Sequence, residues 1–241
     1  MTGLRSAAFL LGSLVVTPVF GVLVPLAGIF SMYAAQYLAR AWARCILKWV
    51  EWACGIGYVV HGAENIPAGP AVIMAKHQSA WETLFLAATF PYQCWIVKRE
   101  LLWLPFVGWG LVALRAIAID RKSGVAAREQ IVQQGSKLLA KGLWVTIFPE
   151  GTRVRVGQAG RYGIGGATLA TRTGAPILPV AHNAGEFWGR NAFRKHAGTV
   201  QVVIGPVIDT QGRDAIAVTR EVEAWIEGEV RRLNPERYAA P

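Results

Sequence analysis

The feature that most limits how this chain can fold is the stretch from residue 6 to residue 39, which contains no charged side chain. About 20 apolar residues are enough to cross the hydrocarbon core of a bilayer, so the stretch permits a transmembrane helix. Pro18 and Pro25 interrupt it, which also permits a broken or re-entrant pair of helices. Arg5 followed by apolar residues resembles a signal peptide, but the stretch is too long for one. We therefore expect a hydrophobic membrane-anchoring helical segment.

Basic and aromatic residues follow the charge-free stretch directly. Residues 37–54 are predicted to form a helix that carries three basic residues and three tryptophans: Arg40, Arg44, Lys48, Trp42, Trp49 and Trp52. An interfacial helix combines rings in the lipid with cations at phosphate level, although the same rings could pack against the domain that follows. If the preceding stretch spans the bilayer, these cations place the main domain on the cytoplasmic side of the inner membrane.

Composition favours a membrane-associated protein with an acidic partner. Apolar residues make up 53% of the chain, mean hydropathy is +0.33, and there are 10 tryptophans. The net charge of +10 favours anions, which could be lipid headgroups, a phosphorylated substrate, an acidic carrier protein or nucleic acid. Nucleic acid is the weakest of these, because the basic residues follow predicted strand ends and form no continuous stripe. The cysteines have neither disulfide-scaffold nor metal-ligand spacing, so no metal site is expected.

From residue 57 onward, short apolar runs alternate with helical segments. Strands are predicted at residues 58–61, 71–75, 94–97, 116–119, 143–148, 177–181 and 200–204, and helices at 81–89, 125–141, 165–173 and 214–233. This alternation indicates a single α/β sandwich domain with a largely parallel central sheet. No linker divides it, so we expect a membrane-associated helical segment at residues 1–56 and an α/β domain at residues 57–241.

A histidine and a glutamate follow the predicted strand at 71–75. His77 would lie at the carboxyl end of that strand, where α/β sheets place their ligands, and Glu82 would lie in the first turn of the next helix. The carboxylate could bind one ring nitrogen and leave the other free as a base. Ser79, between them, is more typical of a helix cap than of a nucleophile. Most isolated His–Glu pairs have no catalytic role, so the pair alone is weak evidence.

A second motif follows the predicted strand at 143–148. Residues 148–153 read FPEGTR, in which Gly151 frees the backbone for a turn. Thr152 and Arg153 offer donors suited to phosphate. The same turn could also simply cap a helix.

Three further segments complete the pattern. Residues 98–101 read KREL and lead into an apolar stretch up to residue 111, residues 118–121 read AIDR, and residues 177–180 read ILPV. The apolar stretch could seat an acyl chain or contact the membrane. The two prolines at residues 176–180 suit a sheet edge or the wall of a substrate tunnel.

Taken together, these blocks resemble the glycerolipid acyltransferase family over about residues 58–205. The matching blocks are HxxxxE at 77–82, KREL and PFVG at 98–108, AIDR at 118–121, FPEGTR at 148–153 and ILPV at 177–180. The family usually has aspartate at the position of Glu82. It often has two basic residues at positions 163 and 164, where this chain has glycine and isoleucine. The second departure shifts the expected phosphate contacts to Lys98, Arg121 and Arg153.

The resemblance implies transfer of a fatty acyl group from acyl-CoA or acyl-carrier protein to the sn-2 hydroxyl of lysophosphatidic acid, giving phosphatidic acid. It implies His77 as the general base and Glu82 as the carboxylate that orients it, without a metal or other cofactor. It also implies a set of residues around the acceptor phosphate: Lys98, Arg121, Glu150, Gly151, Thr152 and Arg153. Two alternatives stay open. One is an acyltransferase of the same fold acting on glycerol-3-phosphate, another lysophospholipid or a lipid A precursor; the other is a non-catalytic module that binds anionic lipid.

Overall fold

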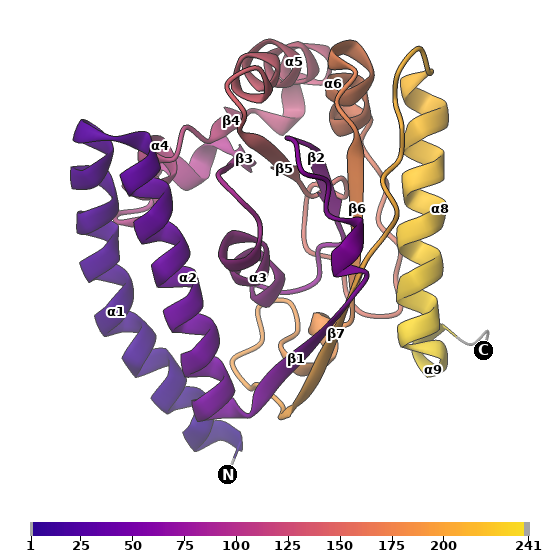
Figure 1. Ribbon diagram of the computed structural model, residues 1–241. Helices are drawn as coiled ribbons and strands as arrows, with labels where there is room; N and C mark the ends of the chain where they lie inside the picture. Colours follow the sequence, from indigo (N-terminus) through magenta and orange to yellow (C-terminus); the bar gives the residue numbers. More distant parts are fainter. Residues whose placement is uncertain (1, 239–241) are drawn as a thin grey trace.

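The computed structural model describes residues 2–238, which are built around a seven-stranded sheet (Figure 1). The strands are β1 (Ile56–His61), β2 (Val72–Ala75), β3 (Gln93–Lys98), β4 (Ile117–Ile119), β5 (Trp144–Ile147), β6 (Ile177–His182) and β7 (Gly198–Ile204). Their spatial order is β1-β7-β6-β2-β5-β3-β4. Neighbouring strands are parallel except β6 and β7, which are antiparallel. The predicted α/β fold with a largely parallel sheet is confirmed.

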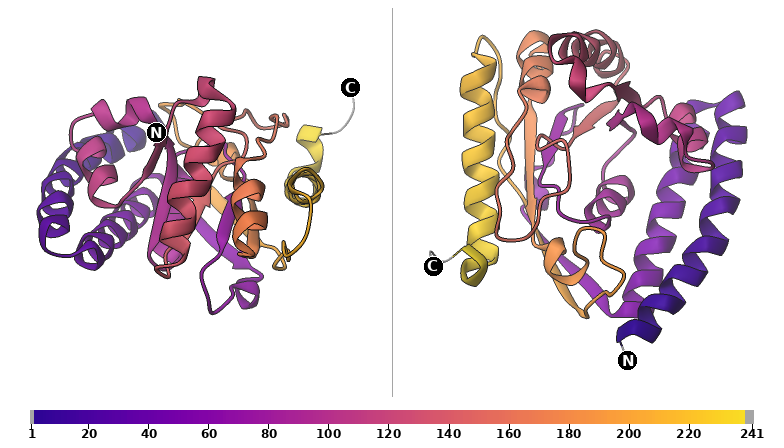
Figure 2. Two further views of the ribbon diagram at one scale, coloured as in Figure 1. Left: turned by 90° about the horizontal axis from the view of Figure 1, so that it is seen from above. Right: turned by 180° about the vertical axis from the view of Figure 1, so that it is seen from behind.

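Helices cover both faces of the sheet (Figure 2). On one face lie α1 (Thr2–Phe30), α2 (Met32–Cys54) and α3 (Trp81–Thr89); on the other lie α5 (Val125–Leu139), α6 (Gly165–Thr173) and α8 (Ala215–Leu233). The remaining helical segments are short: α4 (Val107–Ala113), α7 (Ala184–Phe187), α9 (Pro235–Tyr238) and the 3-10 turns η1 (Ala63–Asn65), η2 (Arg99–Trp103) and η3 (Arg121–Ser123).

The central strands are apolar on both faces because helices cover both. Along β2, Ile73 and Ala75 belong to the buried cluster that contains α2 and α3. Val72 and Met74 belong to the buried cluster that contains α5, α6 and α8. This two-sided burial produces the short continuous apolar runs from which the strands were predicted.

The charge-free stretch is divided between two helices, and the break between them does not lie at Pro18 or Pro25. α1 continues through Pro18 and Pro25 to Phe30, although each proline removes one helical N–H donor. α2 begins at Met32, earlier than the predicted start at residue 37, because the Ser31 hydroxyl caps its first turn. The predicted break is therefore present but lies at Ser31. By length and composition, α1 could cross a membrane.

The tryptophans of α2 divide between packing and exposure. The indole N–H of Trp42 donates to Thr17 Oγ1 at 3.3 Å, and that of Trp49 donates to the Phe9 carbonyl at 3.0 Å. Both rings therefore hold α1 against α2, which favours the packing alternative for them. Trp52 is 75% exposed and is free to contact lipid.

Two of the basic residues on α2 contact the protein itself. Arg40 donates to the Thr89 carbonyl and Arg44 to the Ala88 carbonyl, both at 3.3 Å. These carbonyls end α3, where cations favourably meet the helix dipole and the unpaired carbonyl groups. α2 is thus joined to α3 as well as to α1. The buried cluster accordingly continues across residue 56, the predicted boundary between the anchor segment and the domain.

Residues 177–180 lie in β6, inside the sheet, and Pro176 directly precedes that strand, so the predicted sheet edge is wrong. The alternative of a tunnel wall stays a prediction. β6 has β7 on one side and β2 on the other, and all its residues are buried. Pro179 is tolerated because β6–β7 pairing begins at the next residue, Val180. The Pro179 carbonyl still accepts the Gly205 N–H at 2.9 Å. Its missing donor therefore affects only the end of the ladder.

Candidate active site

His77 and Glu82 meet where β2 ends and α3 begins. His77 Nδ1 lies 2.8 Å from Glu82 Oε1. An ionised carboxylate only accepts hydrogen bonds, so Nδ1 carries the ring proton and donates it. This leaves the lone pair of Nε2 available, in the arrangement required of a general base.

Phe148 fixes the plane of the His77 ring. The two rings stack with centroids 3.9 Å apart and an interplanar angle of 10°. The His77 carbonyl accepts the Val154 N–H at 2.8 Å, which ties the segment after β2 to the FPEGTR turn. The His77 side chain is only 14% exposed, so its ring is held on one face and by one nitrogen.

Glu82 is fully buried, and backbone donors compensate its charge. The Gln78 and Ser79 N–H groups donate to its carboxylate at 3.0 and 2.9 Å. Burial alone would raise its pKa, but the imidazoles of His182 and His77, together with the Ser79 amide, hold the pKa below its usual value. Glu82 is therefore ionised at neutral pH and able to stabilise an imidazolium at position 77.

A second histidine, which was not predicted, lies behind this pair at the end of β6. His182 Nδ1 accepts the Ala184 N–H at 3.2 Å, so the ring proton is on Nε2, which donates to the Lys76 carbonyl at 2.9 Å. His182 Nε2 is 3.9 Å from Glu82 Oε2. Burial lowers the pKa of His182, although the Glu82 carboxylate opposes the shift. Residues at the carboxyl ends of strands in α/β sheets often lie at the binding site. This rule was used for His77 and would also have indicated His182, at the end of β6.

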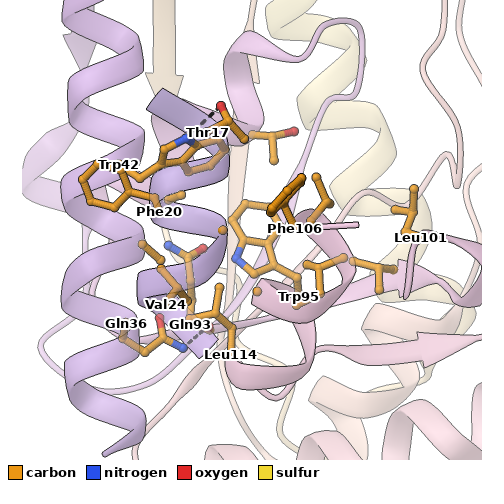
Figure 3. Close-up of a pocket in the computed structure, with 18 of the residues that line it drawn as sticks. Thr17, Phe20, Val24, Gln36, Trp42, Gln93, Trp95, Leu101, Phe106 and Leu114 are labelled. Carbon is orange, nitrogen blue, oxygen red and sulfur yellow. Dashed lines mark hydrogen bonds between the residues drawn. The ribbon is translucent and has the colours of Figure 1, made fainter. Parts of the chain in front are cut away.

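A cavity of about 350 Å³ borders His77 and lies between the α1–α2 pair and the sheet (Figure 3). Its lining is mainly apolar and comes from α1, α2, β3 and the η2–α4 region, with Phe20, Val24, Trp42, Trp95, Phe106 and Leu114 among its walls. The end of KREL and the apolar stretch after it line this cavity through Leu101, Phe106, Val107, Gly110 and Leu111. The volume falls within the usual range of small-molecule sites, about 300–1,000 Å³.

Two of the predicted phosphate contacts reach the cavity and one does not. Arg121, at the start of η3, and Arg153, in the FPEGTR turn, both line it. Burial lowers the pKa of Arg121, with Glu100 opposing the shift. The Arg153 Nε atom is buried without a hydrogen-bond partner in the part of the chain that the structure describes. Lys98 is exposed, pairs with Glu100 at 3.3 Å and does not line the cavity.

The rest of the FPEGTR turn has a structural arrangement of its own. Glu150 is buried and forms an ion pair with Lys76 at 2.6 Å, outside the cavity lining. Gly151 has a φ of 68°, which favours glycine, and its N–H donates to the Phe148 carbonyl. Thr152 is exposed and also lies outside the lining. The substrate-binding roles of Gly151, Thr152 and Lys98 stay predictions. Among residues 2–238, no group of three or more metal-ligating side chains could hold a metal ion.

Residues 57–183, which contain the His77–Glu82 pair and the FPEGTR turn, match the family model for acyltransferases. The chain belongs to the acyltransferase family. This acyltransferase is 44% identical over 203 residues to a 1-acyl-sn-glycerol-3-phosphate acyltransferase of Pseudomonas aeruginosa, covering 83% of this chain and 79% of the relative. Relatives of the same name from Borreliella burgdorferi and, as the alpha form, from Homo sapiens are 34% and 31% identical. Their matches cover 69% and 70% of this chain and 67% and 61% of the relatives.

The fold also matches a solved structure. The crystal structure of the 1-acyl-sn-glycerophosphate (LPA) acyltransferase PlsC from Thermotoga maritima is similar to this acyltransferase with a TM-score of 0.80. The match covers 96% of this chain and 95% of that one at 21% sequence identity. The predicted resemblance to glycerolipid acyltransferases is therefore confirmed, and so is the α/β fold predicted from the alternation of apolar runs and helical segments.

The buried, neutral His182 makes the stability of this acyltransferase depend on pH. Its pKa is lowered in the folded state, whereas an unfolded histidine titrates near pH 6.5. As the pH falls below about 6.5, the unfolded state binds a proton that the folded state does not, so stability falls by up to about 1.4 kcal/mol per pH unit. Glu82, whose pKa is also lowered, loses its stabilising effect only at lower pH. We expect His182→Gln to flatten the dependence of the unfolding free energy on pH between about 5 and 7.

The measurement is denaturant unfolding in detergent at several pH values. The glutamine side chain of His182→Gln keeps an N–H donor for the Lys76 carbonyl but cannot titrate in this range. The exposed His196→Gln variant is the matched control. An equal loss of slope in both variants would contradict the role of His182.

Proposed function

We propose that this acyltransferase transfers a fatty acyl group from acyl-CoA or acyl-carrier protein to the sn-2 hydroxyl of lysophosphatidic acid, giving phosphatidic acid. One observation carries the proposal: His77, Arg121 and Arg153 all line the same apolar cavity. A base, an apolar space and two cations suit a hydroxyl, an acyl chain and a phosphate. The names of the relatives indicate the same acceptor.

In the proposed reaction, His77 Nε2 accepts the proton of the sn-2 hydroxyl while the hydroxyl oxygen attacks the thioester carbonyl. The pKa of such an alcohol is close to that of water and far above neutral pH, so the alcohol needs a positioned base, which contributes about 10²–10⁴-fold. Glu82 keeps the proton on Nδ1 and stabilises the imidazolium. When the tetrahedral intermediate collapses, the C–S bond breaks and the imidazolium proton goes to the departing thiolate. The products are the new ester and the free thiol, and His77 returns to its neutral form.

Arg121 and Arg153 would hold the acceptor phosphate and so fix where its hydroxyl lies. Guanidinium groups bind phosphate oxygens through two parallel N–H donors, which gives orientation as well as attraction. Neither residue belongs to an ion pair within the described residues, so their charges are available to a ligand. Positioning of this kind lowers the barrier because the reacting atoms are already aligned.

We propose that α1 and the η2–α4 region contact the inner membrane, with the active site on its cytoplasmic side. α1 exposes a row of large apolar side chains that includes Leu11, Leu14, Val15, Val19, Leu26 and Ile29. α4 packs against α1 and adds Trp109, and η2 adds Trp103, which is 84% exposed. Both parts also line the cavity. A lipid acceptor could therefore enter the cavity from the bilayer.

The base assignment predicts that His77→Ala lowers kcat by about 10²–10⁴-fold. Glu82→Gln should lose most of the activity as well, because every partner of this carboxylate is a donor and the new amide N–H₂ would face one of them. Glu82→Asp keeps the charge and should retain more activity than Glu82→Gln. Acyl transfer to lysophosphatidic acid by purified protein measures all three. Near-normal turnover by His77→Ala, with a folded protein by circular dichroism, would exclude His77 as the base.

The phosphate assignment predicts that Arg121→Ala raises the KM for lysophosphatidic acid by about 10- to 100-fold, since a charged hydrogen bond is worth about 1.5–3 kcal/mol. The KM for the acyl donor should change little. Arg99→Ala is the matched control, because Arg99 is a neighbouring exposed arginine that pairs with Asp120 and does not line the cavity. Equal increases for acceptor and donor would argue against a phosphate role for Arg121.

The membrane assignment predicts that Trp103 lies within the bilayer, either among the acyl chains or at their boundary with the headgroups. Brominated phospholipid in the vesicles quenches the fluorescence of tryptophans that contact lipid. Trp103→Phe should therefore lower the part of the tryptophan fluorescence that the brominated lipid quenches. Trp225→Phe on α8, across the sheet from α1, should lower only the part of the fluorescence that the brominated lipid does not quench. If Trp103→Phe also lowers only the unquenched part of the fluorescence, η2 does not contact lipid.

A further inference from the structure

A buried ionic cluster lies directly behind His77. The Lys76 ammonium donates to Glu150 Oε1 at 2.6 Å, to Glu227 Oε1 at 2.7 Å and to the Gln158 carbonyl at 3.3 Å. All three of its N–H donors are thereby used. Tyr162 completes the cluster by donating its hydroxyl proton to Glu227 Oε1 at 2.9 Å.

The cluster is buried, and its opposite charges stabilise one another. The side chains of Lys76 and Glu150 are 0% exposed. Burial alone would lower the pKa of Lys76, but the Glu150 and Glu227 carboxylates raise it above its usual value. Lys76 therefore stays charged at neutral pH. None of these side chains lines the cavity, so none is placed to bind the acceptor.

Glu150 also binds the backbone of the catalytic histidine. Its Oε1 accepts from Lys76, and its Oε2 accepts the His77 N–H at 2.8 Å. The other side of the same peptide segment is held by His182, which donates to the Lys76 carbonyl. The peptide that carries His77 is thus fixed by side chains from the FPEGTR turn and from β6.

We propose that Glu150 is a positioning residue, which fixes the backbone of His77 and does not bind substrate, and that the Lys76 ammonium holds the Glu150 carboxylate in place. The proposal rests on the function proposed above, because it assigns a role within that reaction. Through Lys76 the cluster reaches Glu227 on α8, which lies outside the residues 57–183 that match the family and outside the cavity lining.

Two isosteric substitutions separate this role from a general effect of charge. Glu150→Gln and Glu227→Gln each remove one negative charge from the same cluster. Both oxygens of Glu150 accept from donors, so a glutamine there must turn its N–H₂ toward one of them and lose that contact. Glu227 Oε2 has no partner among the described residues, so a glutamine can place its N–H₂ there and keep both other contacts.

The experiment measures steady-state kinetics with lysophosphatidic acid and an acyl-CoA, together with thermal unfolding, for wild type and both variants. We expect Glu150→Gln to lower kcat by up to about 100-fold, the cost of a small displacement of a reacting group, with an unchanged KM for the acceptor. Glu227→Gln should stay close to wild type in both constants. An increased acceptor KM in Glu150→Gln, or an equal loss of kcat in both variants, would overturn the proposal. A wild-type protein that does not acylate lysophosphatidic acid would instead overturn the proposed function.

A triple variant covers the case in which Glu150→Gln does not fold. In Lys76→Met/Glu150→Gln/Glu227→Gln the cluster has no charge, and replacing a whole buried ionic network is often neutral for stability. With the ammonium absent, the glutamine introduced at position 150 can turn its oxygen to the His77 N–H and its N–H₂ group away. We expect the kcat of the triple variant to recover to within about 10-fold of wild type, because the hydrogen bond at His77 is restored. Loss of kcat below that level in a folded triple variant would overturn the positioning role.

Discussion

The buried carboxylate of Glu82 is the interaction on which the site depends. Taking a carboxylate out of water costs several kcal/mol, and here one imidazole N–H and the amides of Gln78 and Ser79 offset that cost. These donors belong to the turn between β2 and α3. The carboxylate that orients His77 therefore also folds the turn that presents it, and a change in its charge affects the chemistry and the local structure together.

The α1–α2 pair has two roles, which apolar residues at different positions along it serve. One face of the sheet needs a helical cover, and α2 supplies part of it through residues such as Ile46 and Val50. Farther along the pair, Phe20 and Trp42 do not close against the sheet but leave the cavity beside His77. The region that matches the family, residues 57–183, contains His77, Arg121 and Arg153, whereas the apolar space also requires helices that precede this region.

Sequence reasoning worked where a residue's role depends on its local neighbours. The central strands could be predicted because burial on both faces makes each one a short apolar run. His77 and Glu82 could be predicted because they are joined across a single turn. It could not separate Lys98 from Arg121, since both are basic residues near strand ends and only the packing of η2 and η3 decides which one reaches the cavity. Lys76 was missed for a related reason. Its partner Glu227 is 151 positions away, and no local pattern indicates that contact.

The two ends of α3 explain how the α1–α2 pair is linked to the Glu82 carboxylate. At its first turn α3 is fixed by Glu82, and at its last turn by Arg40 and Arg44 of α2. These cations were predicted to lie at lipid phosphate level, yet they satisfy the carbonyl groups that end a helix, where a positive charge is favourable. A helix of nine residues held at both ends has little freedom to tilt. Arg40 and Arg44 therefore join α2 directly to the helix whose first turn carries Glu82, the partner of His77.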